Sequence, residues 1–161
     1  MVDKNQAVID YLITCPSIQN TPLYFNFINA QNDNKQIIIL ANDKALNKSY
    51  IDGSVLKRFT FTIIDFKSVT FIPIPKQEGM SNENVEDMST VQAIIDWISE
   101  QADLRNYPNF GSDCLVEDIR TTTENPNLNG VDNSLVPALA KYSISIQVDY
   151  LDTSKMIWKG E

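Results

Sequence analysis

Residues 142–150 read Tyr-Ser-Ile-Ser-Ile-Gln-Val-Asp-Tyr, and this alternating run decides the class of fold. In a β-strand successive side chains point to opposite faces, so the run predicts a strand with one buried face and one wet face. Strands of this kind belong to antiparallel sheets or to sheet edges. The apolar members of the run are Tyr142, Ile144, Ile146, Val148 and Tyr150.

Two segments show the three- and four-residue spacing of amphipathic helices. The first covers residues 3–14, with Asp3 as its cap and Pro16 as its end. The second covers residues 89–104, where Ser89 or Thr90 is the expected cap. The apolar stripes are Ala7, Val8, Tyr11 and Leu12 in the first segment and Val91, Ile94, Ile95, Ile98 and Ala102 in the second.

Further strands are predicted from runs of β-branched and aromatic residues. Residues 23–29 and 36–41 are expected to form a hairpin with a turn at residues 32–34, and residues 115–120 a shorter strand. In residues 56–66 the apolar positions change parity after Ile63, which predicts a β-bulge or an edge twist. Loops are expected at residues 17–21, 42–53, 76–88 and 121–136, where polar residues, glycine and proline collect.

The order of these elements predicts an α+β fold. We expect a single domain over residues 1–161, with two main helices packed on a mostly antiparallel sheet of four to five strands.

The composition excludes several kinds of catalysis. The chain has no histidine, which removes Ser-His-Asp and Cys-His catalysis and histidine metal ligands. The net charge is −8, and it is unevenly placed: residues 1–76 carry eight cations and six anions, whereas residues 77–161 carry five cations and fifteen anions. Such a chain is a poor nucleic-acid clamp, because phosphate binding needs lysine and arginine. The acidic half is either a solvated surface or an acidic surface past which DNA moves without binding.

Few residues remain as candidates for chemistry. Cys15 and Cys114 are expected to be free, reduced thiols, because no secretory signal or apolar membrane span is found and a cytoplasmic setting follows. The run from Asn125 to Gly130 resembles a calcium loop but has Asn at its first position and Val136 at its twelfth. The residues therefore predict no enzyme, no metal and no cofactor.

Five segments in this order resemble the tail terminator proteins, also called minor capsid or tail completion proteins, of bacteriophages and prophages of Gram-positive hosts. They are Tyr24-Phe25-Asn26, the YIDGS motif at 50–54 leading into Phe59-Thr60-Phe61, VQAIIDWISEQ at 91–101, NYPNFG at 106–111 and YSISIQVDYL at 142–151. The resemblance covers the chain from about Val8 to Leu151.

The resemblance implies a structural protein of the virion that is assembled in the host cytoplasm. Such a protein forms a homo-oligomeric ring, usually of six subunits, that caps the tail tube, stops tube growth and joins the head. The implied partners are other copies of the chain, the tail-tube protein, head-side neck or connector proteins and a sheath protein. DNA would pass through the lumen without specific binding, and no membrane is implied. The alternatives are another phage ring protein (a head–tail adaptor or tail-tube subunit), an enzyme such as an acetyltransferase, and a nucleic-acid accessory protein.

Two groups of residues follow as candidates. The motif turns, expected to be structural and with contact to a neighbour as the alternative, are Tyr50, Ile51, Asp52, Gly53, Asn106, Tyr107, Pro108, Phe110 and Gly111. The candidate subunit or partner interface comprises Lys57, Arg58, Lys67, Glu78, Glu83, Glu86, Asp87 and Trp97. Among these, the three cations are expected to face a neighbour or the outside, leaving a neutral or acidic lumen.

Overall fold

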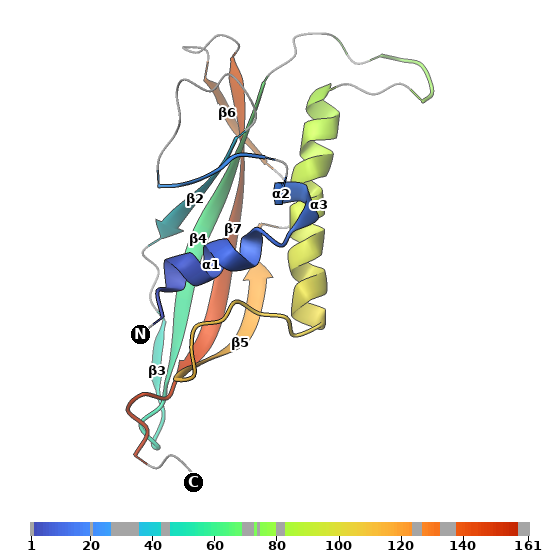
Figure 1. The fold of residues 1–161 in the computed structure, drawn as a ribbon. Coiled ribbons are helices and arrows are strands. Elements are labelled where there is room, and N and C mark those ends of the chain that lie inside the picture. The colour runs from blue at the N-terminus through green and yellow to red at the C-terminus, as the bar shows by residue number, and fades with distance from the viewer. Residues whose placement is uncertain are drawn as a thin grey trace.

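The chain is described by a computed structural model, in which helices lie on one face of a long twisted sheet (Figure 1). The structure describes residues 2–19, 21–26, 36–42, 46–68, 73, 75–79, 83–123, 127–132 and 138–157.

Two 14-residue strands, β4 (Val55–Ser68) and β7 (Leu139–Asp152), form the centre of the sheet. They pair antiparallel over their whole length, from Val55 opposite Asp152 to Ser68 opposite Leu139. The path across the sheet is β1-β2-β4-β7-β5, where β1 is Leu23–Phe25, β2 is Gln36–Asn42 and β5 is Cys114–Thr121. Two short strands complete it: β3 (Asn47–Ser49) pairs with β4, and β6 (Asn127–Asp132) pairs with β7.

The helices cover one face of this sheet and share one hydrophobic core with it. They are α1 (Lys4–Leu12), the four-residue α2 (Pro16–Gln19) and the 21-residue α3 (Glu83–Asp103). Ala7, Leu12 and Ile98 pack there against Phe61 and Ile146 of the central strands. The predicted α+β class and the mostly antiparallel sheet are therefore confirmed, as are two main helices.

One pairing prediction is wrong. β1 and β2 run parallel, with Leu23 opposite Ile37, instead of forming a hairpin. The turn expected at residues 32–34 lies outside the described residues. Both strands are rich in β-branched and aromatic residues, which favours strands but does not fix their relative direction.

The expected bulge after Ile63 is also absent, because the register of β4 against both β2 and β7 is continuous there. The parity change has another cause: β4 is apolar on both faces. Ile63 belongs to the main core, whereas Ile64 and Phe66 pack with Leu139 and Tyr24 in a second cluster on the opposite face.

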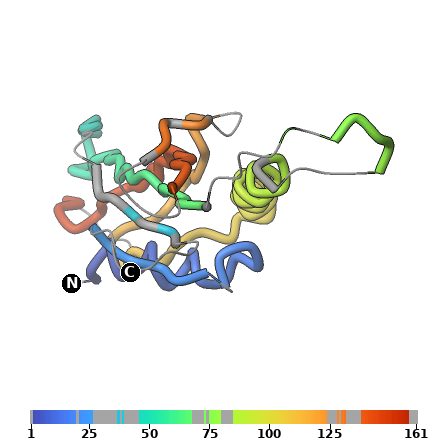
Figure 2. The backbone as a smooth tube through the Cα atoms, turned by 90° about the horizontal axis from the view of Figure 1, so that it is seen from above, coloured from blue at the N-terminus to red at the C-terminus, as the bar shows by residue number. Residues whose placement is uncertain are grey.

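The loop predictions need four corrections. Residues 17–21 include part of α2, residues 42–53 include β3, and residues 121–136 include β6. α3 begins at Glu83, so the second half of the loop expected at residues 76–88 is helical. Of the described residues in this predicted loop, 76–79 are exposed, and they lie away from the sheet beyond α3 (Figure 2).

The expected cap of α3 is corrected as well. Ser89 and Thr90 lie inside the helix, where their hydroxyls donate to the carbonyl oxygens of Val85 and Glu86 at 3.1 and 3.2 Å. A hydroxyl that bonds back to the carbonyl four residues earlier is typical of a helix interior. Asp3, by contrast, caps α1 as predicted, and its side chain accepts from the backbone N–H groups of Asn5 and Gln6.

Candidate functional site

The turn between β3 and β4 projects beyond the helices at one end of the molecule (Figure 1). Its backbone is held by hydrogen bonds from Gly53 N to Tyr50 O at 3.1 Å and from Tyr50 N to Ser54 O at 2.9 Å. The carboxylate of Asp52 accepts from both Ser54 N at 2.9 Å and Ser54 Oγ at 2.6 Å. Gly53 has φ +87°, a conformation that L side chains rarely adopt.

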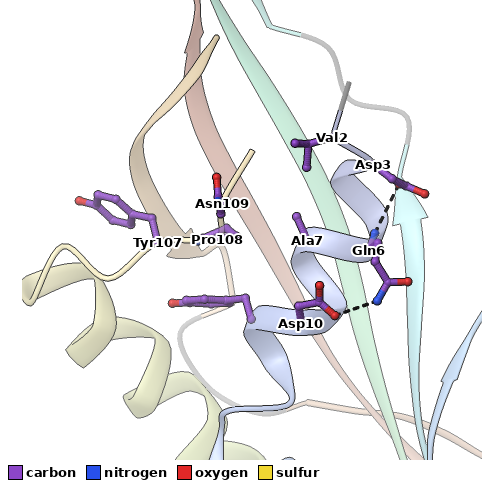
Figure 3. A pocket seen from close by; sticks show the side chains of 9 residues that line it. Val2, Asp3, Gln6, Ala7, Asp10, Tyr107, Pro108 and Asn109 are labelled. Carbon is purple, nitrogen blue, oxygen red and sulfur yellow. Dashed lines mark hydrogen bonds between the residues drawn. The ribbon is translucent and has the colours of Figure 1, made fainter. Parts of the chain in front are cut away.

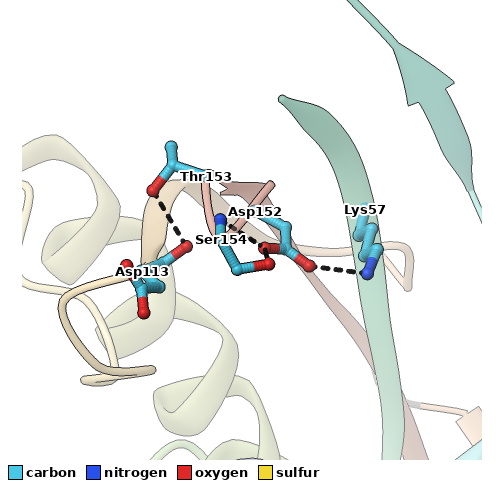
Figure 4. Close-up of polar contacts among 5 residues, drawn as sticks. All are labelled: Lys57, Asp113, Asp152, Thr153 and Ser154. Atoms are coloured by element: carbon cyan, nitrogen blue, oxygen red, sulfur yellow. Dashed lines mark hydrogen bonds and ion pairs between the residues drawn. The ribbon is translucent and has the colours of Figure 1, made fainter. Parts of the chain in front are cut away.

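The segment after β7 packs against this turn. Ile157 N donates to Asp52 O at 2.8 Å, and a Cβ on Gly53 would overlap the carbonyl oxygen of Lys155. Thr153 anchors the segment on its other side, where its N–H donates to Asp113 O at 2.8 Å and its hydroxyl donates to the same oxygen at 3.2 Å, the bond drawn in Figure 4. We call residues 50–53 together with residues 153–157 the hairpin tip.

The hairpin tip holds apolar side chains in solvent. Ile51 is fully exposed, at 101% of its reference surface, and Ile157 is 82% exposed. Tyr50 is 42% exposed, and the Lys48 ammonium lies 5.6 Å from its ring centroid. A rigid turn that keeps aliphatic side chains in water is the kind of surface on which proteins meet other proteins.

Two ion pairs lie on β4 and β7 beside the hairpin tip. Lys57 Nζ is 2.7 Å from Asp152 Oδ2 (Figure 4), and Arg58 donates to both carboxylate oxygens of Asp149, at 2.7 and 3.1 Å. The hydrogen bond with Asp152 raises the pKa of Lys57, and the bonds with Lys57 and Ser154 lower the pKa of Asp152. Lys57 and Arg58, which the sequence predicts to face a neighbour or the outside, are therefore paired with acids of the C-terminal half of the same chain.

The second motif turn, residues 106–111, folds inward. Phe110 is 3% exposed and makes edge-to-face contacts with Phe59 and Tyr150, at centroid distances of 5.8 and 5.3 Å. Asn109 Oδ1 accepts from Gly111 N at 2.9 Å, and Gly111 has φ +93°. Two further residues of this turn lie on its inner side: Pro108 is buried, and Tyr107 packs against the core. Asn106 is exposed and donates to Gln101 Oε1 at 2.5 Å.

Two predicted interface residues are buried in the chain, so their assignment is wrong. Lys67 is 3% exposed, and its ammonium lies 3.5 Å from the carboxylate of Asp65, which is 1% exposed. Asp87 of α3 is also 3% exposed. Burial raises the pKa of Tyr142, and the nearby charges of Asp87 and Asp65 add to the shift, which places both acids near this phenol.

The remaining interface candidates are dispersed. Glu78 and Glu86 are exposed, in the turn at 75–79 and in α3 respectively. Trp97 is half-buried and packs on Tyr11, with ring centroids 5.1 Å apart. The side chain of Glu83 lies outside the described part.

Two cavities flank α1. One, of about 430 Å³, lies between α1 and residues 107–109 (Figure 3). The other, of about 490 Å³, is lined by residues that include Lys4, Lys57, Phe110, Cys114 and Asp152. In the second cavity the Lys4 ammonium lies 5.3 Å from the Tyr150 ring centroid, a cation–π distance.

The two cysteines and the described acidic side chains do not gather into a metal-binding cluster. Cys15 and Cys114 are both free, as expected, and burial raises the pKa of Cys15. No group of three or more metal-ligating side chains occurs among the described residues, and of the calcium-like run Asn125 lies outside them. In the part of the chain that the structure covers, no helix is long and apolar enough to cross a bilayer.

Sequence reasoning missed the segment after β7 as part of the hairpin tip. The contact is made by backbone atoms of Asp52 and Ile157, so no pattern of side chains in the sequence predicts it. Tyr11 was assigned to the core from its spacing, which is correct, but its place in the wall of a cavity depends on residues 107–109 almost a hundred positions later.

No protein-family model and no curated protein sequence matches this chain.

Proposed function

We propose that this chain is a structural subunit of a phage tail, a tail terminator that forms a ring on the tail tube and joins it to the head. The observation that carries the proposal is the hairpin tip, where a clamped turn holds Ile51 fully in solvent. A contact surface that is already rigid loses less conformational entropy on binding than a mobile loop does. The hairpin tip therefore supports an assembly role, with a neighbouring subunit or tube protein covering Ile51.

The edges of the sheet support a ring in particular. No described strand pairs with the outer edge of β3 or of β5, and the two lie on opposite sides of the central pair. A subunit with two different free edges can contact its neighbours head to tail, and such heterologous contacts close into rings when the rotation allows.

The cations of β4 support the proposed neutral or acidic lumen. Lys57 and Arg58 are each paired with an aspartate, and Lys67 is buried beside Asp65. Paired or buried cations are poor ligands for passing phosphates, because binding would break an existing ion pair.

Negative-stain microscopy of the purified protein tests the proposal. We expect short closed rings, with neighbour contacts of more than roughly 1,000 Å² each. Long polymers would favour a tail-tube subunit instead. Discrete monomers at all concentrations would contradict the assembly role.

A further inference from the structure

The two free margins of the sheet, β3 and β5, lie at the same level. Lys48 of β3 lies opposite Leu56 of β4, which lies opposite Leu151 of β7. Leu151 in turn lies opposite Leu115 of β5. Figure 1 shows β3 and β5 on the two sides of the central pair, and no described strand pairs with the outer edge of either. One row of opposed residues therefore joins the two margins, so two sheets placed side by side bring β3 and the start of β5 together.

The directions of the two margins also match. The pairings β3–β4, β4–β7 and β7–β5 are all antiparallel, so β3 and β5 run in opposite directions. A second copy in the same orientation beside the first therefore presents its β3 antiparallel to β5. This is the arrangement that a head-to-tail contact between identical subunits requires.

The backbone of β3 points hydrogen-bonding groups to its outer edge. In an antiparallel pair, residues bonded to one neighbouring strand alternate with residues whose N–H and C=O groups point to the other side. Tyr50 N donates to Ser54 O in the turn to β4. Two residues earlier, Lys48 also points its backbone groups toward β4. Asn47 and Ser49 therefore point theirs outward.

The same reasoning applies to β5. Thr153 N donates to Asp113 O, just beyond the end of the β5–β7 pairing. Cys114 and Val116 therefore point their backbone groups to the outer edge. The Cys114 N–H donates to Gly111 O at 3.3 Å, which, among the described residues, leaves the Cys114 carbonyl oxygen and the groups of Val116 for a neighbour.

We propose that β3 of one copy adds to the outer edge of β5 of the next copy, with Ser49 opposite Cys114 and Asn47 opposite Val116. In this register, residues that point backbone groups outward meet each other, as an antiparallel ladder needs. The inference rests on the proposed assembly function and specifies its contact. The hairpin tip follows β3 directly, so the same addition brings the tip of one copy to the start of β5 of the next.

The charges of the two edges favour a second copy as the occupant. The side chain of Lys48 is exposed, and in this register it lies beside Leu115 of the next copy. Glu117, which is exposed, and Asp118 follow along β5. Diagonal neighbours on adjacent strands are within reach of long side chains. The basic residue of β3 therefore meets the acidic part of β5.

The native thiol of Cys114 provides the test. Ser49→Cys places a thiol directly opposite Cys114 of the next copy, at a Cα separation of about 4.5–5.5 Å, which a disulfide spans. Within one chain the two positions are three strand spacings apart, about 14 Å, so this disulfide joins different copies. We expect mild oxidation of the full-length protein to give cross-linked dimers and higher species on a non-reducing gel.

Asn47→Cys is the matched control. Asn47 and Ser49 point to the same face of β3, but in the proposed register Asn47 is a diagonal neighbour of Cys114, at about 7–8 Å. We expect its cross-linking to be at least about tenfold slower than that of Ser49→Cys, because the Cα separation is beyond disulfide range. Equal rates, or faster cross-linking of Asn47→Cys, would overturn the proposed register.

Negative-stain images of the same samples before oxidation separate this inference from the proposed function. Rings in which Ser49→Cys does not cross-link would overturn the edge pairing and leave the ring in place. Cross-linked open polymers would support the pairing and contradict the closed ring. A wild type and a Ser49→Cys variant that both stay monomeric would contradict both.

A charge exchange tests the choice of partner edge. Lys48→Glu places an acid beside Glu117 of the next copy, and we expect about fivefold weaker association for each contact. The double variant Lys48→Glu with Glu117→Lys should regain the wild-type association, with urea unfolding as the check that both variants fold. A double variant that associates as weakly as Lys48→Glu would show that β5 is not the partner edge.

Discussion

The two motif turns share the same local structural features, but they place their apolar side chains in opposite environments. Each has a glycine with positive φ, Gly53 or Gly111, and a side-chain oxygen that accepts a bond from a backbone N–H two residues later. Residues 106–111 turn Phe110 into the core, whereas residues 50–53 hold Ile51 in solvent. These shared features therefore do not show whether a turn packs into the core or forms a contact surface. The burial of the neighbouring apolar side chain shows which role the turn has.

The largest loss of stability should come from truncating Phe110, the buried aromatic side chain of residues 106–111. Phe110→Ala removes a buried ring that contacts Phe59 and Tyr150, and we expect the free energy of unfolding to fall by about 3–5 kcal/mol. The control is Ile51→Ala on the other turn, which should change stability by less than about 0.5 kcal/mol. Urea unfolding of both variants measures the difference. Equal losses of unfolding free energy would contradict the proposed difference between the two turns.

The two glycines sharpen the comparison. Gly53→Ala forces a side chain to adopt φ +87° and to overlap the backbone carbonyl of Lys155, so we expect a loss of about 3 kcal/mol. Gly111→Ala has a similar φ, but its Cβ would meet only the side chain of Val2, with Cγ2 at 2.9 Å, and this side chain can move. Its cost should be about 1–2 kcal/mol, mostly backbone strain. Thermal unfolding ranks the pair, and the reverse order would contradict the clamp at the hairpin tip.

A smaller effect is expected from the ion pair beside the hairpin tip. The pKa of Asp152 is lowered in the folded state, so its stabilisation is present above about pH 4, the ordinary aspartate value, and is lost as the pH falls below it. Lys57 is 37% exposed, so we expect Asp152→Asn to cost only about 0.5–1 kcal/mol at neutral pH.

Stability measured between pH 7 and pH 2 should then fall less steeply for Asp152→Asn than for the wild type. Lys57→Met supplies the other arm of a double-mutant cycle. Parallel pH curves for wild type and Asp152→Asn would mean that the pair does not stabilise the fold.

The sequence predicted what depends on neighbouring residues. The alternation at 142–150 and the stripe from Val91 to Ala102 identified β7 and α3, because periodicity reports the buried face directly. Gly53 and Phe110 are expected to be structural from the motif turns YIDGS and NYPNFG, and the positive φ of Gly53 and the burial of Phe110 agree with that role.

Long-range choices were not predictable in this way. The parallel direction of β1 on β2 depends on pairing across the fold. Lys67 is expected from the sequence to face a neighbour or the outside, but it is buried, and its partner Asp65 is two residues away on the same face of β4. A charge pair at that spacing within an apolar strand is a signal that could have indicated burial.

Sedimentation velocity of the wild type and Ile51→Asp tests the central claim, that the hairpin tip is the surface through which this chain assembles. We expect the wild type to sediment as a closed oligomer at micromolar concentration and Ile51→Asp as a monomer with unchanged urea stability. A wild type that stays monomeric, or an Ile51→Asp variant that assembles as well as the wild type, would contradict the account.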